Sequence, residues 1–222
     1  MNSQETISKT KTSPQASATS IKDILRSIVV LFKLRVVILL VLSSLGGALI
    51  ASDGKVSLSA LGLLLGTGIL SSAGASAINQ YLERSSDALM RRTLNRPLAA
   101  GIVSNPKAIL GIASGFIAIA IGLALLFGNP ALALFLALGA AIYIGIYTVW
   151  LKPRTLLNIV IGGAAGSCAV LSGSAAAGNW SEPGAITLAL LVFIWTPTHF
   201  WSLAMAFRDD YSRAGVPMLP TV

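Results

Sequence analysis

The chain has 222 residues, of which 55% are hydrophobic and 11% charged, and its formal net charge is +8. So small a charged fraction, against roughly 25% in a soluble domain, excludes an ordinary soluble globular protein. A single cysteine excludes an internal disulfide and a thiolate metal cluster. The excess of basic residues does not require a nucleic-acid partner, and we expect none, because these residues gather beside long apolar segments.

Residues 1–20 are polar and rich in serine and threonine, which predicts a disordered tail. Six apolar segments follow, each close to the roughly 20 residues that a helix needs to cross a bilayer. They cover residues 28–50, 57–78, 106–127, 131–150, 157–177 and 185–206. The sequence therefore predicts an all-α, polytopic transmembrane helix bundle, with one domain over residues 21–222. Glycine, alanine and serine are abundant within the segments, and such small residues let membrane helices pack closely.

Lysine and arginine are distributed unevenly between the two sides of this predicted bundle. Fifteen of the 16 fall before or at the start of the first segment, in or beside the connection 79–105, in 151–155 or after 206. Lys55 alone lies on the other side. Because basic residues concentrate on the cytoplasmic side of membrane proteins, we expect a cytoplasmic N-terminus in a multi-pass protein of a prokaryotic cell membrane.

Three polar residues follow the second segment at intervals of four: Asn79, Glu83 and Asp87. On a helix this spacing places them on one stripe roughly 80° wide. An amide oxygen and two carboxylates suit Mg²⁺, which proteins usually hold through one or two carboxylates together with substrate phosphates and water. The alternative is a solvated helix end whose carboxylates pair with their own arginines.

Arginines come directly after this stripe, in "RRTLNRPL", residues 91–98. The guanidinium group donates a rigid fork of hydrogen bonds that suits phosphate oxygens. We therefore expect Arg92 and Arg96 to bind a diphosphate whose metal is held by the carboxylates, with Asn79 in support. Arg91 could instead be a simple cytoplasmic anchor.

A second charged cluster, "FRDDYSRAGVPMLP", follows the sixth segment on the same side. It contains Asp209, Asp210 and Arg213, and glycine and prolines end any helix beyond them. We expect its carboxylates to face those of Glu83 or Asp87 across one cavity mouth. The predicted metal-binding and catalytic set is thus Glu83, Asp87, Asp209 and Asp210, with Arg213 binding substrate. Asp87 and Arg92 are both expected at a water-accessible boundary.

Two further polar residues lie in or at the start of apolar segments. His199, the only histidine, stands between aromatic residues in "WTPTHFW", and ionisable groups within membrane segments are rare and tend to be functional. His199 could contact an aromatic acceptor or its metal, or be a hydrogen-bonded structural residue. Asn158 could face the same pocket, or only satisfy a helix end.

The stretch "NQYLERSSDALMRRTLNRPL", residues 79–98, resembles the first signature of the protoheme IX farnesyltransferases, or heme O synthases. These are UbiA-type intramembrane prenyltransferases. The matching positions are Asn79, Glu83, Asp87, Met90, Arg92, Thr93, Arg96 and Pro97, and Glu83 favours the heme branch. The stretches "RTLLNIVIGGAAGS", "WTPTHFWSLA" and "DDYSRAGVPMLP" are similar to later segments of the same family.

The resemblance implies transfer of a farnesyl group from farnesyl diphosphate to a vinyl group of heme b, giving heme O, with Mg²⁺ as cofactor. It also implies a bilayer setting, a bundle of nine membrane helices, and heme A synthase as a possible partner. Only six spans are present, so we expect the chain to be incomplete at its C-terminus. The alternatives are a UbiA-type enzyme with another aromatic acceptor and, from a different class, a membrane transporter. Transporters usually bind near the bilayer midplane, whereas the acidic clusters here lie at one boundary.

Overall fold

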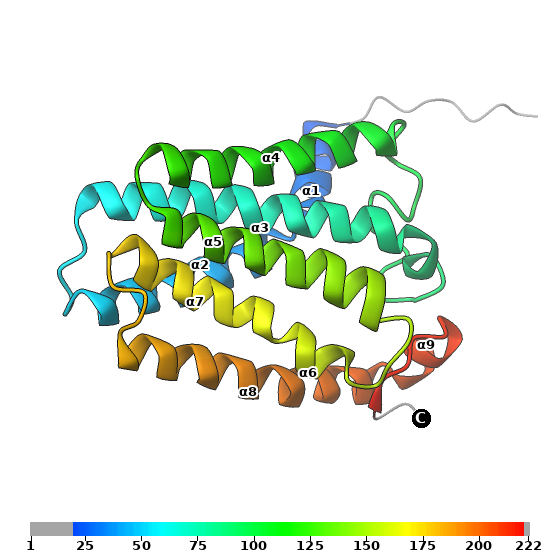
Figure 1. The fold of residues 1–222 in the computed structure, drawn as a ribbon. Helices are drawn as coiled ribbons and strands as arrows, with labels where there is room; N and C mark the ends of the chain where they lie inside the picture. The colour runs from blue at the N-terminus through cyan, green and yellow to red at the C-terminus, as the bar shows by residue number, and fades with distance from the viewer. Residues whose placement is uncertain (1–19, 220–222) are drawn as a thin grey trace, which may run out of the picture.

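The computed structural model describes residues 20–219, and these fold into a bundle of long helices (Figure 1). The predicted tail falls outside the described residues, apart from Ser20. The elements in chain order are α1 (Ile21–Leu31), α2 (Leu34–Ala51), α3 (Leu58–Asp87), α4 (Pro106–Leu126), α5 (Pro130–Ala140), η1 (Ala141–Leu151), α6 (Asn158–Gly162), α7 (Ala164–Ala176), α8 (Pro183–Ala206) and α9 (Arg208–Arg213). No strand occurs within 20–219. The all-α prediction is confirmed.

Six helical stretches are long and apolar enough to cross a membrane. They are α2, α3, α4, α5 with η1, α6 with α7, and α8, and they correspond one to one with the six predicted segments. Their starts carry the expected signals. Asn105, Asn129 and Glu182 each accept a hydrogen bond from the first helical turn, and each precedes a proline.

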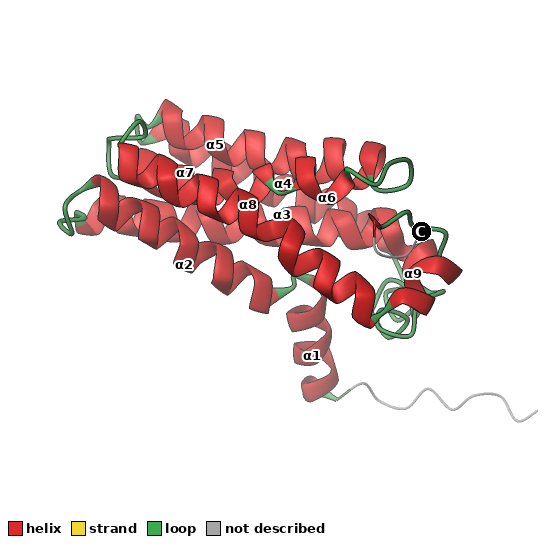
Figure 2. Ribbon diagram, turned by 90° about the horizontal axis from the view of Figure 1, so that it is seen from below, coloured by secondary structure: helices red, strands yellow, loops and turns green. Residues whose placement is uncertain are grey.

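The predicted start of the first span at residue 28 is wrong. The chain breaks after α1, and Lys33 adopts the left-handed backbone conformation, with φ 48° and ψ 47°. The side chain of Gln80 on α3 stabilises the break, because its Nε2 donates to the carbonyls of Val30 at 2.6 Å and Leu31 at 2.9 Å. These are carbonyls that an uninterrupted helix would itself have bonded. The span therefore begins at Leu34, and α1 points away from it (Figure 2).

Glycines allow close contact between α2 and α7. A Cβ on Gly173 would overlap the carbonyl oxygen of Ser44, and one on Gly47 would overlap that of Val170. The predicted packing role of small residues is confirmed at these positions. Gly62, Gly66 and Gly68 on α3 have open space instead.

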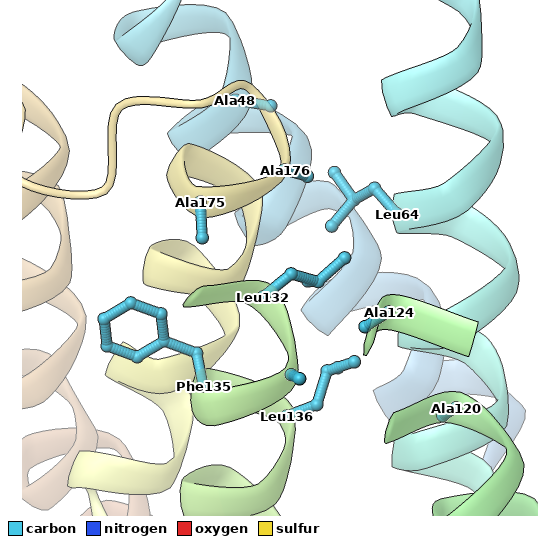
Figure 3. Close-up of a cluster of buried hydrophobic side chains, with 10 residues drawn as sticks. Ala48, Leu64, Ala120, Ala124, Leu132, Phe135, Leu136, Ala175 and Ala176 are labelled. Carbon is cyan, nitrogen blue, oxygen red and sulfur yellow. The ribbon is translucent and has the colours of Figure 1, made fainter. Parts of the chain in front are cut away.

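The two ends of the bundle differ in chemistry. Leucines, alanines and Phe135 from five helices form an apolar core toward the end that carries the 127–129 and 177–182 turns (Figure 3). At the other end α3 finishes, and there the 88–105 connection, the end of η1 and α9 come together (Figure 1). We call this the charged end. Buried polar side chains lie there beside two smaller apolar clusters, one around Ile78 and Leu98 and one around Tyr211 and Met218.

Candidate active site at the charged end of the bundle

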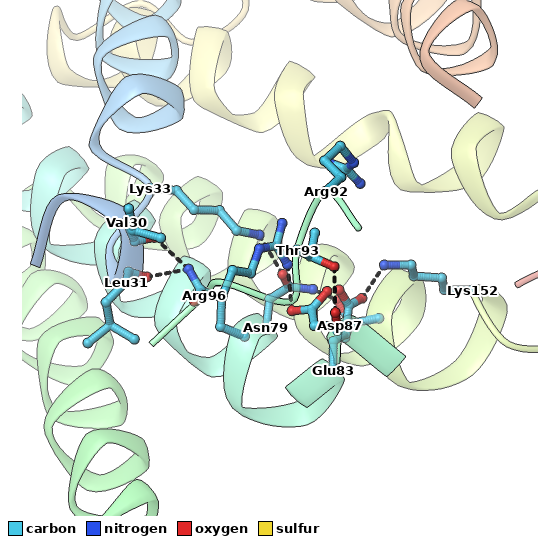
Figure 4. Close-up of polar contacts among 12 residues, drawn as sticks. Val30, Leu31, Lys33, Asn79, Glu83, Asp87, Arg92, Thr93, Arg96 and Lys152 are labelled. Carbon is cyan, nitrogen blue, oxygen red and sulfur yellow. Dashed lines mark hydrogen bonds and ion pairs between the residues drawn. The ribbon is translucent and has the colours of Figure 1, made fainter. Parts of the chain in front are cut away.

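Asn79, Glu83 and Asp87 lie on one face of the last turns of α3, as their spacing predicts (Figure 4). Asn79 and Asp87 are only 2% and 1% exposed, and the Glu83 side chain is 10% exposed. The expectation that Asp87 is water-accessible is wrong. The 88–105 connection folds back over the helix end, and Thr93 donates a hydrogen bond to the Asp87 carbonyl at 2.9 Å. The stripe thus lies inside the protein rather than on a solvated helix end.

Each member of the stripe has its own basic partner. Lys33 Nζ donates to Asn79 Oδ1 at 2.5 Å, and Lys152 Nζ lies 2.5 Å from Glu83 Oε1. Arg96 Nη1 lies 2.6 Å from Asp87 Oδ2. These partners come from the α1–α2 break, the end of η1 and the 88–105 connection, so two segments distant in sequence and the connection that follows α3 converge on one face of this helix.

Lys33 and Lys152 are functional candidates that the sequence motifs do not contain. In the sequence they count only toward the basic excess that predicts the orientation. A signal was available, since each lies at the end of an apolar span on the same side as the acidic stripe. Burial, with the positive charge of Arg96 as a second cause, lowers the pKa of Lys33 from 10.5 to about 7.

η1 forms one wall of the site. Its i→i+5 hydrogen bonding, rare and often found at functional sites, brings Thr148 Oγ1 to the Tyr143 carbonyl at 2.8 Å. Thr148 in turn accepts from Asn79 Nδ2 at 3.0 Å, and Lys33 donates to the Tyr143 hydroxyl at 3.1 Å. The rings of Tyr143 and Tyr147 are stacked with centroids 5.9 Å apart. A polar, aromatic wall therefore faces the stripe.

One buried oxygen of this site has no hydrogen-bond partner, namely Asp87 Oδ1. A buried carboxylate oxygen left unpaired is costly, and a bound cation would satisfy it. Within residues 20–219, no three histidine, cysteine or acidic side chains gather around one point. The residues therefore fit a metal held by one or two carboxylates, with phosphate and water oxygens completing its coordination, as is usual for Mg²⁺.

The second charged cluster lies at the same end and contacts the first through Arg92. The backbone N–H of Arg92 donates to Asp210 Oδ2 at 3.2 Å, and its guanidinium donates to the Tyr211 hydroxyl at 3.2 Å. Asp210 is buried and lies 3.6 Å from the guanidinium of Arg213. Asp209 is exposed and lines an open cavity of about 450 Å³. The two clusters share one end of the bundle, and a metal-binding role for Asp209 and Asp210 stays a prediction.

Asn158 and His199 lie apart from these contacts. Asn158 is fully buried, and its Nδ2 donates to the carbonyls of Thr155 at 2.7 Å and Pro217 at 2.8 Å, which ties the segment after α9 to the start of α6. His199 is exposed on α8 and stacks on Trp195, with ring centroids 4.5 Å apart. Substrate binding by either residue stays a prediction.

Residues 40–222 match the UbiA prenyltransferase family. The chain belongs to this family. It is 46% identical over 206 residues to a protoheme IX farnesyltransferase of Metallosphaera sedula, covering 92% of this chain and 70% of the relative. A protoheme IX farnesyltransferase of Pyrobaculum arsenaticum is 45% identical, with 87% and 68% covered. This UbiA-family chain thus spans about two thirds of the length of these curated relatives, and the family resemblance of its motifs is confirmed.

Solved structures of UbiA-type proteins have the same fold. A UbiA homolog from Archaeoglobus fulgidus, bound to DMAPP and Mg²⁺, superimposes with a TM-score of 0.69 at 20% identity. A digeranylgeranylglyceryl phosphate synthase gives 0.73 at 18% identity. Each comparison covers 88% of this chain and 68% of the other. The UbiA prenyltransferase therefore has the family's helical bundle.

Proposed function

We propose that this protein transfers a farnesyl group from farnesyl diphosphate to a vinyl group of heme b, giving heme O. The observation that carries the prenyl-transfer chemistry is the buried stripe of Asn79, Glu83 and Asp87, with a cation paired to each member. The choice of farnesyl and heme rests on the relatives near 45% identity that are named protoheme IX farnesyltransferase.

The diphosphate binds at the charged end. Glu83 and Asp87 would hold Mg²⁺, with the unpaired Oδ1 of Asp87 as the first ligand available. When bound, Mg²⁺ would stabilise the negative charge that develops on the departing diphosphate. Lys33, Arg96 and Lys152 surround the stripe and would donate hydrogen bonds to the phosphate oxygens of a bound diphosphate. The DMAPP- and Mg²⁺-bound homolog of the same fold supports this arrangement.

Substrate ionisation breaks the bond between the allylic carbon and the diphosphate oxygen, and the bonding electrons leave with the diphosphate. Fixed cations where that negative charge develops lower the barrier, because they need not reorganise during the reaction. The stacked rings of Tyr143 and Tyr147 lie beside the stripe, where their π faces can stabilise the allylic cation. The vinyl group of the acceptor then attacks the cation, and water adds to the carbon left positive and releases a proton.

The proposed function also requires the charged end to face the side of the membrane where the substrates are. The strong bias in lysine and arginine supports a charged end that faces the cytoplasm of a prokaryotic cell, with the N-terminus on the same side. Farnesyl diphosphate and heme would then reach the site from the cytoplasmic side, and heme O would pass onward to heme A synthase.

The test is a product assay on the whole chain in membranes. Farnesyl diphosphate is supplied with heme b, or with a hydroxybenzoic acid as a competing acceptor, with and without Mg²⁺. We expect Mg²⁺-dependent heme O, identified by its mass and its visible spectrum. Formation of a prenylated aromatic acid without heme O would overturn the assignment of heme b as the acceptor. Failure to release diphosphate with any acceptor would overturn prenyl transfer by this chain.

A further inference from the structure

The short helix α1 is strongly amphipathic. On a helical projection Ile21, Ile24, Leu25, Ile28 and Val29 share one arc roughly 160° wide with Leu31. The opposite arc contains two basic residues, one acidic and two uncharged: Lys22, Arg26, Asp23, Ser27 and Val30. The five apolar residues are 42% to 76% exposed, so this face has no protein partner within the described chain.

The direction of α1 sets it apart from the six spans. Figures 1 and 2 agree that α1 runs across the axis of the bundle rather than along it, near the charged end. Only its last residues pack into the protein, where Leu31 and Phe32 contact the cluster around Ile78 and Leu98. If the spans cross the bilayer, a helix perpendicular to them lies in the membrane plane.

The bend that creates this direction is fixed by contacts. Gln80 holds the free carbonyls of Val30 and Leu31, and Lys33 Nζ is held by Asn79 and Tyr143. Two residues separate α1 from the membrane span α2, which leaves α1 no length to move away from the bilayer surface. Its apolar face is therefore kept at the depth where the span begins.

We propose that α1 is an in-plane helix that docks on the lipid of its own leaflet. Its apolar residues enter the boundary between headgroups and acyl chains, while Lys22 and Arg26 bind the phosphates of anionic lipids. A large amphipathic moment with basic residues on the polar side is the pattern that binds membrane interfaces in this way. An apolar groove of about 220 Å³ starts at Leu34, the residue after the bend, and continues along α2 to Ile69 of α3, so the surface next to α1 also suits acyl chains.

This docking surface is independent of the reaction proposed above, and its test needs no activity. Cys168 is the only cysteine and is buried, so Cys168→Ser gives a background for single labels. In that background Ile24→Cys reports the apolar arc of α1, Lys22→Cys the polar arc, and Lys55→Cys an exposed turn at the opposite end of the bundle. Each variant carries a nitroxide spin label in vesicles of phosphatidylcholine with phosphatidylglycerol.

We expect the Ile24 label to be several-fold more accessible to oxygen, which dissolves in lipid, than to a water-soluble nickel complex. The Lys22 and Lys55 labels should show the reverse ratio. Equal nickel accessibility at Ile24 and Lys22 would mean that α1 lies in water and would overturn the proposal. Exclusion of both reagents at Ile24 would mean that a protein surface covers the helix, and would also overturn it.

The role of the charges is tested by Lys22→Glu with Arg26→Glu, read through the label at Ile24. In vesicles containing phosphatidylglycerol, nickel accessibility should rise several-fold, because repulsion replaces attraction. In phosphatidylcholine alone the same pair should change little. An unchanged label in the anionic vesicles would overturn headgroup binding by Lys22 and Arg26.

Discussion

At the scale of single residues, the carboxylate of Asp87 is the clearest candidate for a reacting role, because its two oxygens differ. Oδ2 is paired with Arg96 at 2.6 Å, whereas the buried Oδ1 has no partner. A purely structural role would be explained by the ion pair between Oδ2 and Arg96, but it would not explain the unpaired Oδ1. An oxygen kept buried and unpaired points to something that binds there.

Replacing Asp87 with asparagine should lower the turnover by roughly 100-fold or more, because the metal loses a charged ligand where transition-state charge is stabilised. The variant should remain folded, since an amide oxygen can still accept from Arg96, although it should lose about 1–3 kcal/mol of stability with the buried charge. Heme O formation and a thermal melt, measured on the same preparation, separate the two effects. Asp53→Asn, in a turn at the opposite end, is the matched control. Normal turnover by Asp87→Asn would remove the metal role.

Lys33 should give the site a pH dependence. Burial lowers its pKa to about 7, so the ammonium is present below pH 7 and is lost as the pH rises through that value. A bound diphosphate favours the ammonium, and so binding of inorganic pyrophosphate with Mg²⁺ should weaken between about pH 6.5 and pH 8. Lys33→Met should weaken binding at low pH and flatten this part of the profile. Titration calorimetry on both proteins checks this, because the protonation of pyrophosphate itself contributes equally to the two profiles. Identical profiles would exclude Lys33 as the cause of the pH dependence.

The lowered pKa of Lys33 also determines how the folding stability changes with pH. The unfolded chain keeps the ordinary pKa of 10.5 and so binds more protons than the folded chain between pH 7 and 10.5. Stability without ligand should therefore rise with pH over this interval as far as Lys33 is concerned. Burying the charged ammonium group of Lys33 destabilises the protein, and a bound diphosphate would offset this effect by pairing with the charge.

At the scale of helices, the sequence predicted the number and positions of the spans because length and hydropathy decide them. The break at Phe32 and Lys33 could not be predicted in this way. The residues on both sides of it are apolar, and the bend depends on Gln80, which lies almost 50 positions away. In the candidate site, too, local spacing could be predicted from the sequence and contacts between distant residues could not. The stripe was visible as spacing on one helix, while Lys33 and Lys152 join it only through tertiary contacts.

The packing of α2 on α7 gives a prediction at this scale. Gly173→Ala should destabilise the bundle strongly, because the new methyl group would overlap the Ser44 carbonyl on a backbone that cannot yield without separating the two helices. Gly66→Ala on α3 is the control, since nothing lies within 4 Å of its Cβ position. Thermal unfolding in detergent should show a large fall in Tm for the first variant and little change for the second. Similar melting of the two variants would contradict close packing at Gly173.

At the scale of the whole molecule, the fold separates two tasks along one axis. The largest apolar cluster lies toward one end, and the buried charges that would bind a diphosphate lie at the other, beside two smaller apolar clusters. Half of the residues in the most apolar stretch of α3 are buried, against 6% of those in α8, and Asn79 and Asp87 on α3 are buried as well. This arrangement would keep the proposed chemistry at one boundary of the bilayer, where a water-soluble diphosphate meets its lipid-soluble chain.

The last prediction concerns which side of the membrane each end of the bundle faces. Of the lysines and arginines within residues 20–219 only Lys55 lies at the end opposite the site, and basic residues concentrate on the cytoplasmic side of membrane proteins. We therefore predict that the site end faces the cytoplasm. With Cys168→Ser as the background, Lys55→Cys should react with a membrane-impermeant maleimide in intact prokaryotic cells. Ser104→Cys, exposed in the 88–105 connection, should react only after the cells are opened. The reverse pattern would place the diphosphate site on the outer face, away from the cytoplasmic substrates that the proposed reaction requires.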